Sequence, residues 1–151
     1  MKTTQGNLIH LAKAGHFDVI VHGCNCFCTM GKGIALSIKR EFPEAYAADC
    51  DTKHGDQSKL GSFSQAFVSL GTRAVTVVNA YTQYDYRGPQ PNVNYKAIRQ
   101  AFRAIKQTFP GARIGYPQIG AGLARGDWAV IAAIIDEELA GEDHTLVIYQ
   151  P

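Results

Sequence analysis

The chain has 151 residues, of which 46% are hydrophobic and 19% are charged, a balance typical of a single globular domain. Fifteen Lys and Arg residues against 13 Asp and Glu residues leave a net charge of +2, too small for a protein that holds a nucleic-acid backbone by its overall charge. No apolar run reaches the roughly 20 residues of a membrane span, and the polar first residues contain no signal segment. We therefore expect one cytosolic domain over residues 1–151, monomeric and without a membrane partner.

The first half of the chain alternates short strands with helices. We expect, in order, a strand with its turn over 2–10, a strand over 18–22, a polar glycine-rich loop over 23–33, a helix from Gly33 to Pro43 and a second helix over 44–53. The apolar run at 18–22 is typical of a strand buried on both faces of a sheet. The helix after the loop carries its apolar residues on one face, and Pro43 ends it.

The second half of the chain continues this alternation. We expect strands over 61–70 and 74–79 around a turn at 71–73, a helix from an N-cap at Asn92 to Pro110, a strand over 113–116, a second glycine-rich loop over 117–126, a helix from an N-cap at Asp127 to Leu139, and a strand over 145–149. Helices interleaved with strands indicate an α/β fold, in which a mixed central sheet is covered on both faces as a three-layer α/β/α sandwich.

Three of the four cysteines fall within five residues, from Cys24 to Cys28, and the fourth is Cys50. A disulfide framework is not expected in the reducing cytosol. The C-x-C-x-C spacing differs from the paired C-x₂-C motifs of structural zinc sites, although His22 and His54 could complete a ligand set on paper. We expect small buried or loop residues here and no bound metal.

Both glycine-rich loops follow a short apolar strand and lead into a helix. In an open α/β sheet, the loops at the carboxyl ends of the strands line the ligand crevice. Glycine lets backbone N–H groups approach an anion closely, and a helix N-terminus adds a favourable dipole. Neither loop has the spacing of a Walker A or dinucleotide-binding motif, and each alone could be a tight turn with packing glycines. Their combination predicts a site for a diphosphate.

Four segments, in this order, resemble a macrodomain, the ADP-ribose-binding α/β module. Gln5–Leu8 resembles the opening Gly-Asp-Leu/Ile motif, Asp18–Asn25 the strand Asp-Ala-Ile-Val-Asn-Ala-Ala-Asn, Met30–Ala35 the first ligand loop and Pro117–Leu123 the diphosphate loop. The resemblance covers nearly the whole chain and leans toward ADP-ribose-1″-phosphate phosphatases and hydrolases that remove ADP-ribose from carboxylates or nucleic acid. It implies ADP-ribose or ADP-ribose-1″-phosphate as the ligand, ADP-ribosylated protein or nucleic acid as alternative substrates, and no cofactor.

The same resemblance implies which residues contact ADP-ribose. Asn7 and Leu8 would contact the adenine, with Tyr149 beside it. Asn25 would contact the distal ribose. The two loops would hold the distal ribose and the phosphates through Gly31, Lys32, Gly33, Ile34, Ile119, Gly120, Ala121, Gly122 and Leu123. Ordinary roles stay open: a turn residue for Asn7, strand packing for Tyr149 and left-handed loop geometry for Asn25.

Hydrolysis at the 1″ position needs one group to activate water or attack and another to protonate the leaving oxygen. His22 ends a buried strand, and the phosphatase branch resembles this sequence in having a histidine there. Asp127 is the carboxylate that we pair with it, although Asp is also a leading N-cap residue, and Asp85 is a third candidate. The lysyl-intermediate mechanism of another branch is not expected, because residues 79–83 contain no lysine and Ala124 replaces the aspartate of that branch.

Two other functions compete with hydrolysis. The first is a non-catalytic reader of ADP-ribose or of ADP-ribosylated macromolecules. The second is a nucleic-acid binder that stacks bases on Tyr81, Tyr84, Tyr86 and Arg87.

Overall fold

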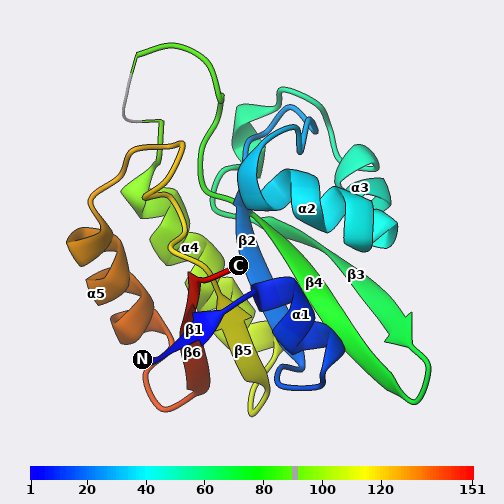
Figure 1. Cartoon of the computed structure of the whole chain (residues 1–151). Helices are drawn as coiled ribbons and strands as arrows, with labels where there is room; N and C mark the ends of the chain where they lie inside the picture. Colours follow the sequence, from blue (N-terminus) through cyan, green and yellow to red (C-terminus); the bar gives the residue numbers. More distant parts are fainter. Residues whose placement is uncertain (90–91) are drawn as a thin grey trace.

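Six strands form one sheet in the computed structural model, which describes residues 1–89 and 92–151. The strands are β1 (Lys2–Gly6), β2 (Val19–Cys24), β3 (Phe63–Leu70), β4 (Arg73–Tyr81), β5 (Arg113–Tyr116) and β6 (Asp143–Tyr149). They lie in the order β1-β6-β5-β2-β4-β3, with β3 antiparallel to β4 and the other neighbours parallel (Figure 1). The predicted mixed central sheet is therefore confirmed.

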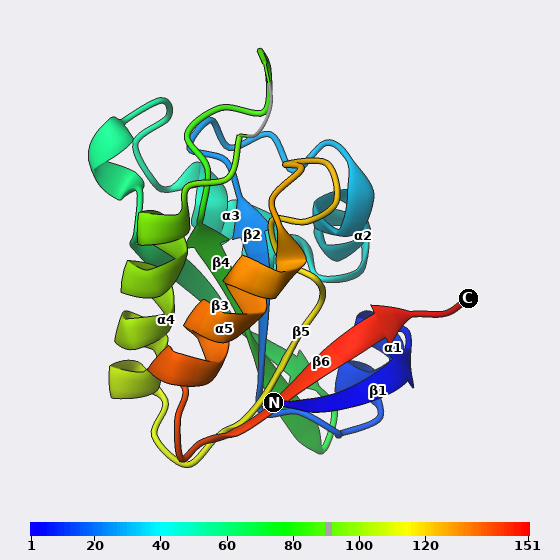
Figure 2. The same ribbon diagram turned by 90° about the vertical axis from the view of Figure 1, so that its left-hand side faces the viewer.

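Helices cover both faces of the sheet. They are α1 (Leu8–Lys13), α2 (Gly33–Glu41), α3 (Pro43–Cys50), α4 (Tyr95–Thr108) and α5 (Trp128–Glu138), with a 3₁₀ turn at Gln57–Lys59. Helices α4 and α5 pack on one face and α1, α2 and α3 on the other, which gives the three layers seen in Figures 1 and 2. None of the helices in the described ranges is long and apolar enough to cross a membrane.

Two apolar clusters separate along the central strands because neighbouring strand residues point to opposite faces. Val21 of β2 and Val78 of β4 pack with α4 and α5, whereas Ile20 and Val77 pack with α1, α2 and α3. All four side chains are buried. A strand covered on both faces favours consecutive apolar residues, which explains the apolar run at 19–21 that predicted β2.

The expectation of a strand with its turn over residues 2–10 is right for β1 and wrong beyond it. Asn7 starts helix α1 instead, because its side chain accepts a hydrogen bond from the backbone N–H of His10 at 3.1 Å. The helix buries Leu8, Ile9 and Ala12 against the sheet. With only six residues, α1 is too short to show a helical period in the sequence.

The N-cap of α4 is Asn94, not Asn92 as predicted. The Asn94 side chain accepts a hydrogen bond from the N–H of Ala97 at 2.9 Å. Both residues have the chemistry of an N-cap, and the two-residue difference leaves Asn92 free to line a cavity. The predicted cap of α5 at Asp127 is correct, and α2 starts at Gly33 as predicted.

Strands β2 and β4 both run two residues beyond their predicted ends. Gly23 and Cys24 of β2 pair with Ala80 and Tyr81 of β4 in the parallel ladder. The backbone can pair there whatever the side chains are, so composition alone underestimates the strand length. This extension brings the start of the first glycine-rich loop to the end of the sheet.

Candidate functional site

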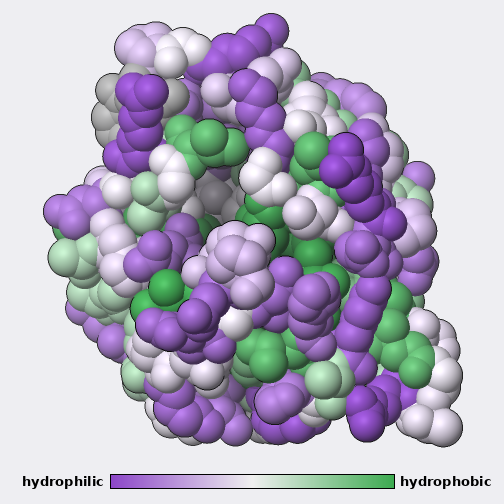
Figure 3. Space-filling view, viewed as in Figure 1, coloured by the Kyte–Doolittle hydropathy of each residue, from purple (hydrophilic) through white to green (hydrophobic). Residues whose placement is uncertain are grey.

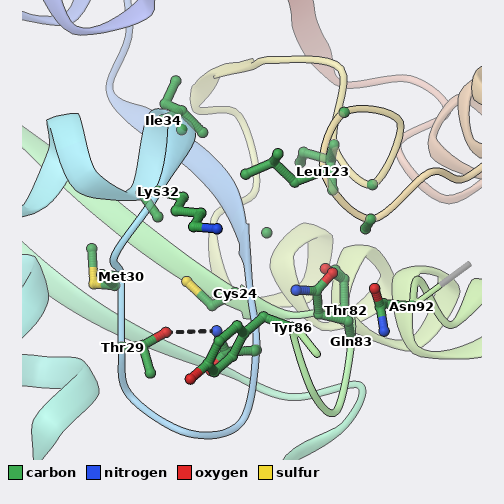
Figure 4. Close-up of a pocket in the computed structure, with 18 of the residues that line it drawn as sticks. Cys24, Thr29, Met30, Lys32, Ile34, Thr82, Gln83, Tyr86, Asn92 and Leu123 are labelled. Atoms are coloured by element: carbon green, nitrogen blue, oxygen red, sulfur yellow. Dashed lines mark hydrogen bonds between the residues drawn. The ribbon is translucent and has the colours of Figure 1, made fainter. Parts of the chain in front are cut away.

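The carboxyl ends of the parallel strands β2, β4 and β5 meet at one edge of the sheet, and the loops that follow them enclose a cavity. Its volume is about 580 Å³, within the range of about 300–1,000 Å³ typical of small-molecule sites. Figure 3 shows the hollow near the centre of one face, bordered by hydrophobic and hydrophilic residues, and Figure 4 shows residues that line it. Both glycine-rich loops therefore contribute to one site.

The first loop is folded by the side chain of Asn25. Its amide nitrogen donates to Thr29 Oγ1 at 2.8 Å and its oxygen accepts from the N–H of Phe27 at 2.8 Å. Two residues that follow, Cys28 and Met30, have left-handed backbones with φ of 59° and 41°, an uncommon conformation for residues other than glycine. Such strain is concentrated at functional sites, where the surrounding structure maintains it.

Helix α2 begins at the cavity with its first N–H groups uncapped. Its N-cap residue is Lys32, whose side chain makes no capping hydrogen bond, and Gly33 turns into the helix with φ of 58°. Gly31, Lys32, Gly33 and Ile34 all line the cavity. Free N–H groups at a helix N-terminus, together with the helix dipole, form a binding site for an anion such as a phosphate.

The second loop closes on itself opposite α2. The N–H of Gly126 donates to the carbonyl of Gly120 at 2.6 Å, and Gly120 has a φ of 75°. A side chain on Gly33 would lie 3.5 Å from Leu123 Cδ1, so the two loops meet at this point. Figure 4 shows Lys32 and Ile34 on one side of the cavity and Leu123 on the other. A ligand in the cavity would lie between the two loops.

Most residues that the resemblance assigns to the ligand lie in the cavity lining: Asn25, Gly31, Lys32, Gly33, Ile34, Ile119, Gly120, Gly122 and Leu123. Ala121 lies in the same loop but is not among the lining residues of the described chain. The adenine candidates lie at the other end of the sheet order, where β1 and β6 pair. Gly6 pairs with the exposed Tyr149, Asn7 caps α1 and Leu8 is buried in the core.

A third loop, after β4, also lines the cavity, although none of its residues was predicted to bind ADP-ribose. It contributes Thr82, Gln83, Tyr86 and Asn92 (Figure 4). Their signal in the sequence is a change from apolar to polar residues at the carboxyl end of a central strand. Gln83 belongs to residues 79–83, the segment whose lack of a lysine argues against a lysyl intermediate.

His22 is fully buried within β2 and does not line the cavity. Its Nε2 lies 2.6 Å from Asn79 Oδ1, and burial lowers the pKa of its imidazole to about 4 despite that hydrogen bond. The Sγ of Cys24, which does line the cavity, lies 3.6 Å from the same nitrogen. His22 is therefore a neutral imidazole at pH 7, in contact with the lining residue Cys24.

The two predicted carboxylates are engaged elsewhere. Asp127 accepts a hydrogen bond from the N–H of Ala129 at 3.0 Å as the cap of α5. Asp85 forms an ion pair with Arg87 at 3.0 Å, and the hydrogen bond from Arg87 lowers the pKa of the Asp85 carboxyl. Neither residue is among the described residues that line the cavity. The structure does not bring His22, Asp127 and Asp85 together.

One acidic residue does line the cavity, and sequence reasoning missed it. Asp49 of α3 is only 1% exposed, and its Oδ1 accepts a hydrogen bond from Tyr81 OH at 2.7 Å. It lies four residues after Ala45, which is also buried, on the face of α3 that packs on the sheet. An aspartate at a core position of a helix is the signal that could have identified it.

The cysteines of the first loop are buried and free. Cys24, Cys26 and Cys28 are all buried, whereas the residues between them are partly exposed. Burial raises the pKa of the Cys24 thiol well above its usual range. Within residues 1–89 and 92–151, no group of three or more His, Cys, Asp or Glu side chains is placed to hold a metal ion.

Tyr81 at the end of β4 and the residues Tyr84, Tyr86 and Arg87 after it do not form the stacking platform considered above. Tyr81 is 1% exposed, and Tyr84 is half-buried with its hydroxyl donating to the carbonyl of Gly55 at 2.8 Å. Only Tyr86 and Arg87 are exposed, with the Arg87 guanidinium 5.3 Å from the Tyr86 ring centre. The idea that all four side chains stack bases is therefore wrong, because two of them serve packing.

Comparison with known proteins supports the interpretation of the fold. A model of the Macro domain family matches residues 21–135, a segment that runs from β2 through most of α5. An uncharacterized 17.5 kDa protein from the tk–vs intergenic region of Enterobacteria phage T4 is 33% identical over 156 residues, which cover 100% of this chain and 97% of that protein.

Solved structures share the same fold. The macrodomain of Thermus aquaticus DarG superposes with a TM-score of 0.72 at 24% identity, over 99% of this chain and 97% of that one. A structure of Thermosipho africanus DarTG in complex with ADP-ribose superposes with a TM-score of 0.70 at 16% identity, over 100% of this chain and 42% of that one.

Proposed function

The chain belongs to the Macro domain family, and we propose that it binds ADP-ribose in the cavity between its two glycine-rich loops and hydrolyses a group linked to the 1″ carbon. The substrate that we propose is ADP-ribose-1″-phosphate. The reaction consumes one water molecule and releases phosphate and ADP-ribose. A similar fold, that of Thermosipho africanus DarTG, has been solved with ADP-ribose.

The observation that carries this proposal is the uncapped N-terminus of α2 at the cavity, facing the second loop. A diphosphate needs hydrogen-bond donors. Free backbone N–H groups supply such donors even in a protein with a small net charge. Lys32 and Arg125 are the cationic side chains among the described lining residues. The adenosine would extend from the diphosphate toward Asn7, Leu8 and Tyr149.

Support for hydrolysis comes from the resemblance of the His22 strand to the phosphatase branch. Because His22 touches Cys24 and not the cavity, its proposed role is to position the cavity wall at the reacting end. Asp127 and Asp85 stay predictions as acid and base, since each would first have to leave its present partner.

Two measurements test the proposal. Calorimetric titration with ADP-ribose tests binding, and failure to bind would reject the whole proposal. Phosphate release from ADP-ribose-1″-phosphate tests hydrolysis in the wild type and in His22→Ala and Asp127→Ala. Equal rates in all three proteins would reject the residue assignments, and binding without release would reject the phosphatase reaction.

A non-catalytic reader is the second candidate, favoured by the position of all three predicted catalytic residues outside the cavity lining. A hydrolase that removes ADP-ribose from protein or nucleic acid is the other alternative. Turnover on a panel of ADP-ribosylated protein, DNA and RNA separates the two, because a reader binds these substrates and leaves them intact. The molar mass of the same protein in solution tests the predicted monomeric state. The cytosolic location stays a prediction.

A further inference from the structure

Strand β3 is the last strand on one side of the sheet, and its outer edge is open (Figure 1). Outside the β3–β4 ladder, no backbone hydrogen bond among the described residues involves β3. An unpaired strand edge presents a row of N–H and C=O groups that can pair with another strand. Proteins protect such an edge with charged side chains, proline, a bulge or a short strand.

The two edges of the sheet differ in this protection. β1, at the opposite edge, has five residues and carries Lys2, whose amino group lies 2.6 Å from Asp143 Oδ1. β3 has eight residues, none of them charged and none a proline, and its register with β4 runs without a bulge. The uncharged stretch extends over residues 60–72. β3 therefore lacks the features that prevent strand pairing.

Alternate residues of β3 direct their backbone groups outward. The N–H of Tyr81 donates to the carbonyl of Ser62 at 2.9 Å, and hydrogen-bonded positions repeat at every second residue of an antiparallel pair. Residues 64–70 with even numbers therefore bond to β4, whereas residues 65, 67 and 69 direct their N–H and C=O groups away from it. Phe67 lies at the middle of this open edge.

The Phe67 side chain is also exposed. At 73% it is the most exposed large hydrophobic side chain in residues 1–89 and 92–151. Its neighbours Ala66 and Val68 are buried in the cluster that α1, α2 and α3 cover, so Phe67 points to the other face of the sheet. Gln65 and Ser69, two residues to either side, are exposed as well. The open edge thus has an apolar centre between two uncharged polar side chains.

We infer that two copies of this chain pair through the outer edges of β3, antiparallel around a two-fold axis at Phe67, so that their sheets become one. This register places Phe67 opposite Phe67 of the second copy, with two backbone hydrogen bonds between them. Gln65 then lies opposite Ser69 of the second copy, and Ala66 opposite Val68. Like charges directly opposite one another destabilise strand pairing, and the uncharged β3 brings none to its own copy.

The paired edge lies away from the cavity. Phe67 pairs with Thr76 in the middle of β4, whereas the cavity lies at the carboxyl end of that strand. Pairing and ADP-ribose binding can therefore be measured independently, and the inference does not rest on the proposed function. It departs from the monomer expected from the sequence, because an open edge becomes visible only in the order of the strands. An interface of this symmetry closes at two copies.

Sedimentation equilibrium over a range of concentrations tests the inference. One pair of edge strands is a small interface, so we expect the wild type to change from one chain to two in the micromolar range. Phe67→Lys removes the aromatic pair and places two positive charges opposite each other, which should raise the dissociation constant by at least about tenfold. Val130→Lys is the matched control, since Val130 is an exposed apolar residue of α5. It should dimerise like the wild type.

Two cysteine variants test the register. Oxidation should link two copies of Phe67→Cys, because directly opposite residues have Cα atoms about 5.5 Å apart, within the reach of a disulfide. Ser69→Cys should not link, since residue 69 lies opposite residue 65 of the second copy. Circular dichroism establishes that each variant is folded.

Three results would overturn the inference. The first is a wild type that stays a single chain up to about 200 μM, which would leave the open edge to an extended peptide of another protein. The second is a dimer that persists unchanged in Phe67→Lys, because another face would then form it. The third is equal linking of Phe67→Cys and Ser69→Cys, which would contradict the two-fold axis at Phe67.

Discussion

His22 shows how burial decides the chemistry of a single side chain. In the sequence it is a histidine at the end of a strand, where protonation near neutral pH is expected. In the fold it is fully buried against Asn79, and burial lowers the pKa of its imidazole to about 4. The unfolded chain then binds a proton that the folded chain does not bind between about pH 4 and pH 6.5.

Stability should therefore fall as the pH falls through this window. The lowered pKa of His22 predicts that lowering the pH from 7 to 5 costs about 2 kcal/mol of unfolding free energy. Urea unfolding at the two pH values measures the change. His22→Gln, which cannot take up the proton, should lose less stability over the same interval by about that amount. An equal loss in both proteins would show that His22 is not the titrating group.

Asp127 can be tested at the same scale, because its two candidate roles need different atoms. As an N-cap it needs only an acceptor oxygen for the N–H of Ala129, which asparagine also provides. Asp127→Ala should lower the unfolding free energy by about 1 kcal/mol, whereas Asp127→Asn should change it by only a few tenths, about 0.3 kcal/mol. Thermal unfolding checks both values. Equal destabilisation by the two variants would contradict the capping role.

At the scale of the elements, the second glycine-rich loop contains one glycine that is closely packed and one that has free space around it. A side chain on Gly120 would lie 2.7 Å from Val93 Cγ2, and its φ is 75°. A side chain on Gly122 would meet nothing within 4 Å. The two glycines lie two residues apart in one loop and form a matched pair.

Gly120→Ala should lower the unfolding free energy by about 2 kcal/mol or more, because it adds a clash to a left-handed backbone. Gly122→Ala should change it by less than about 0.5 kcal/mol. Chemical denaturation of the two variants beside the wild type measures both. Similar stability of the two variants would show that this loop rearranges without cost.

Most elements could be predicted from the sequence because a strand buried on both faces leaves an uninterrupted apolar run, as in β2. Helix α1 could not, since one and a half turns show no period, and Asn92 and Asn94 carry the same capping signal. The two glycine-rich loops of the site were predicted from local pattern. Asp49 was not predicted, because its place in the cavity wall depends on packing of α3 against β4. Its hydrogen bond with Tyr81 joins two residues that lie 32 positions apart in the chain.

At the scale of the whole molecule, the small net charge of +2 fits a site that binds phosphates through backbone N–H groups. Backbone dipoles act at contact distance and are screened less by salt than separated charges. The affinity for ADP-ribose should therefore fall by less than about threefold between 50 mM and 500 mM NaCl. Titrations at both salt concentrations measure this. A steeper fall would indicate that Lys32 and Arg125 dominate binding.

The hairpin of β3 and β4 has a consequence for experiments on living systems. Because β4 ends at the cavity, its first residue, Arg73, lies at the far end of the strand. The turn before it contains Gly71, and a side chain added to Gly71 would have no neighbour within 4 Å. Exposed turns of this kind tolerate insertions. A fluorescent or affinity label inserted at this turn would report where the protein accumulates while leaving the ligand entrance unobstructed.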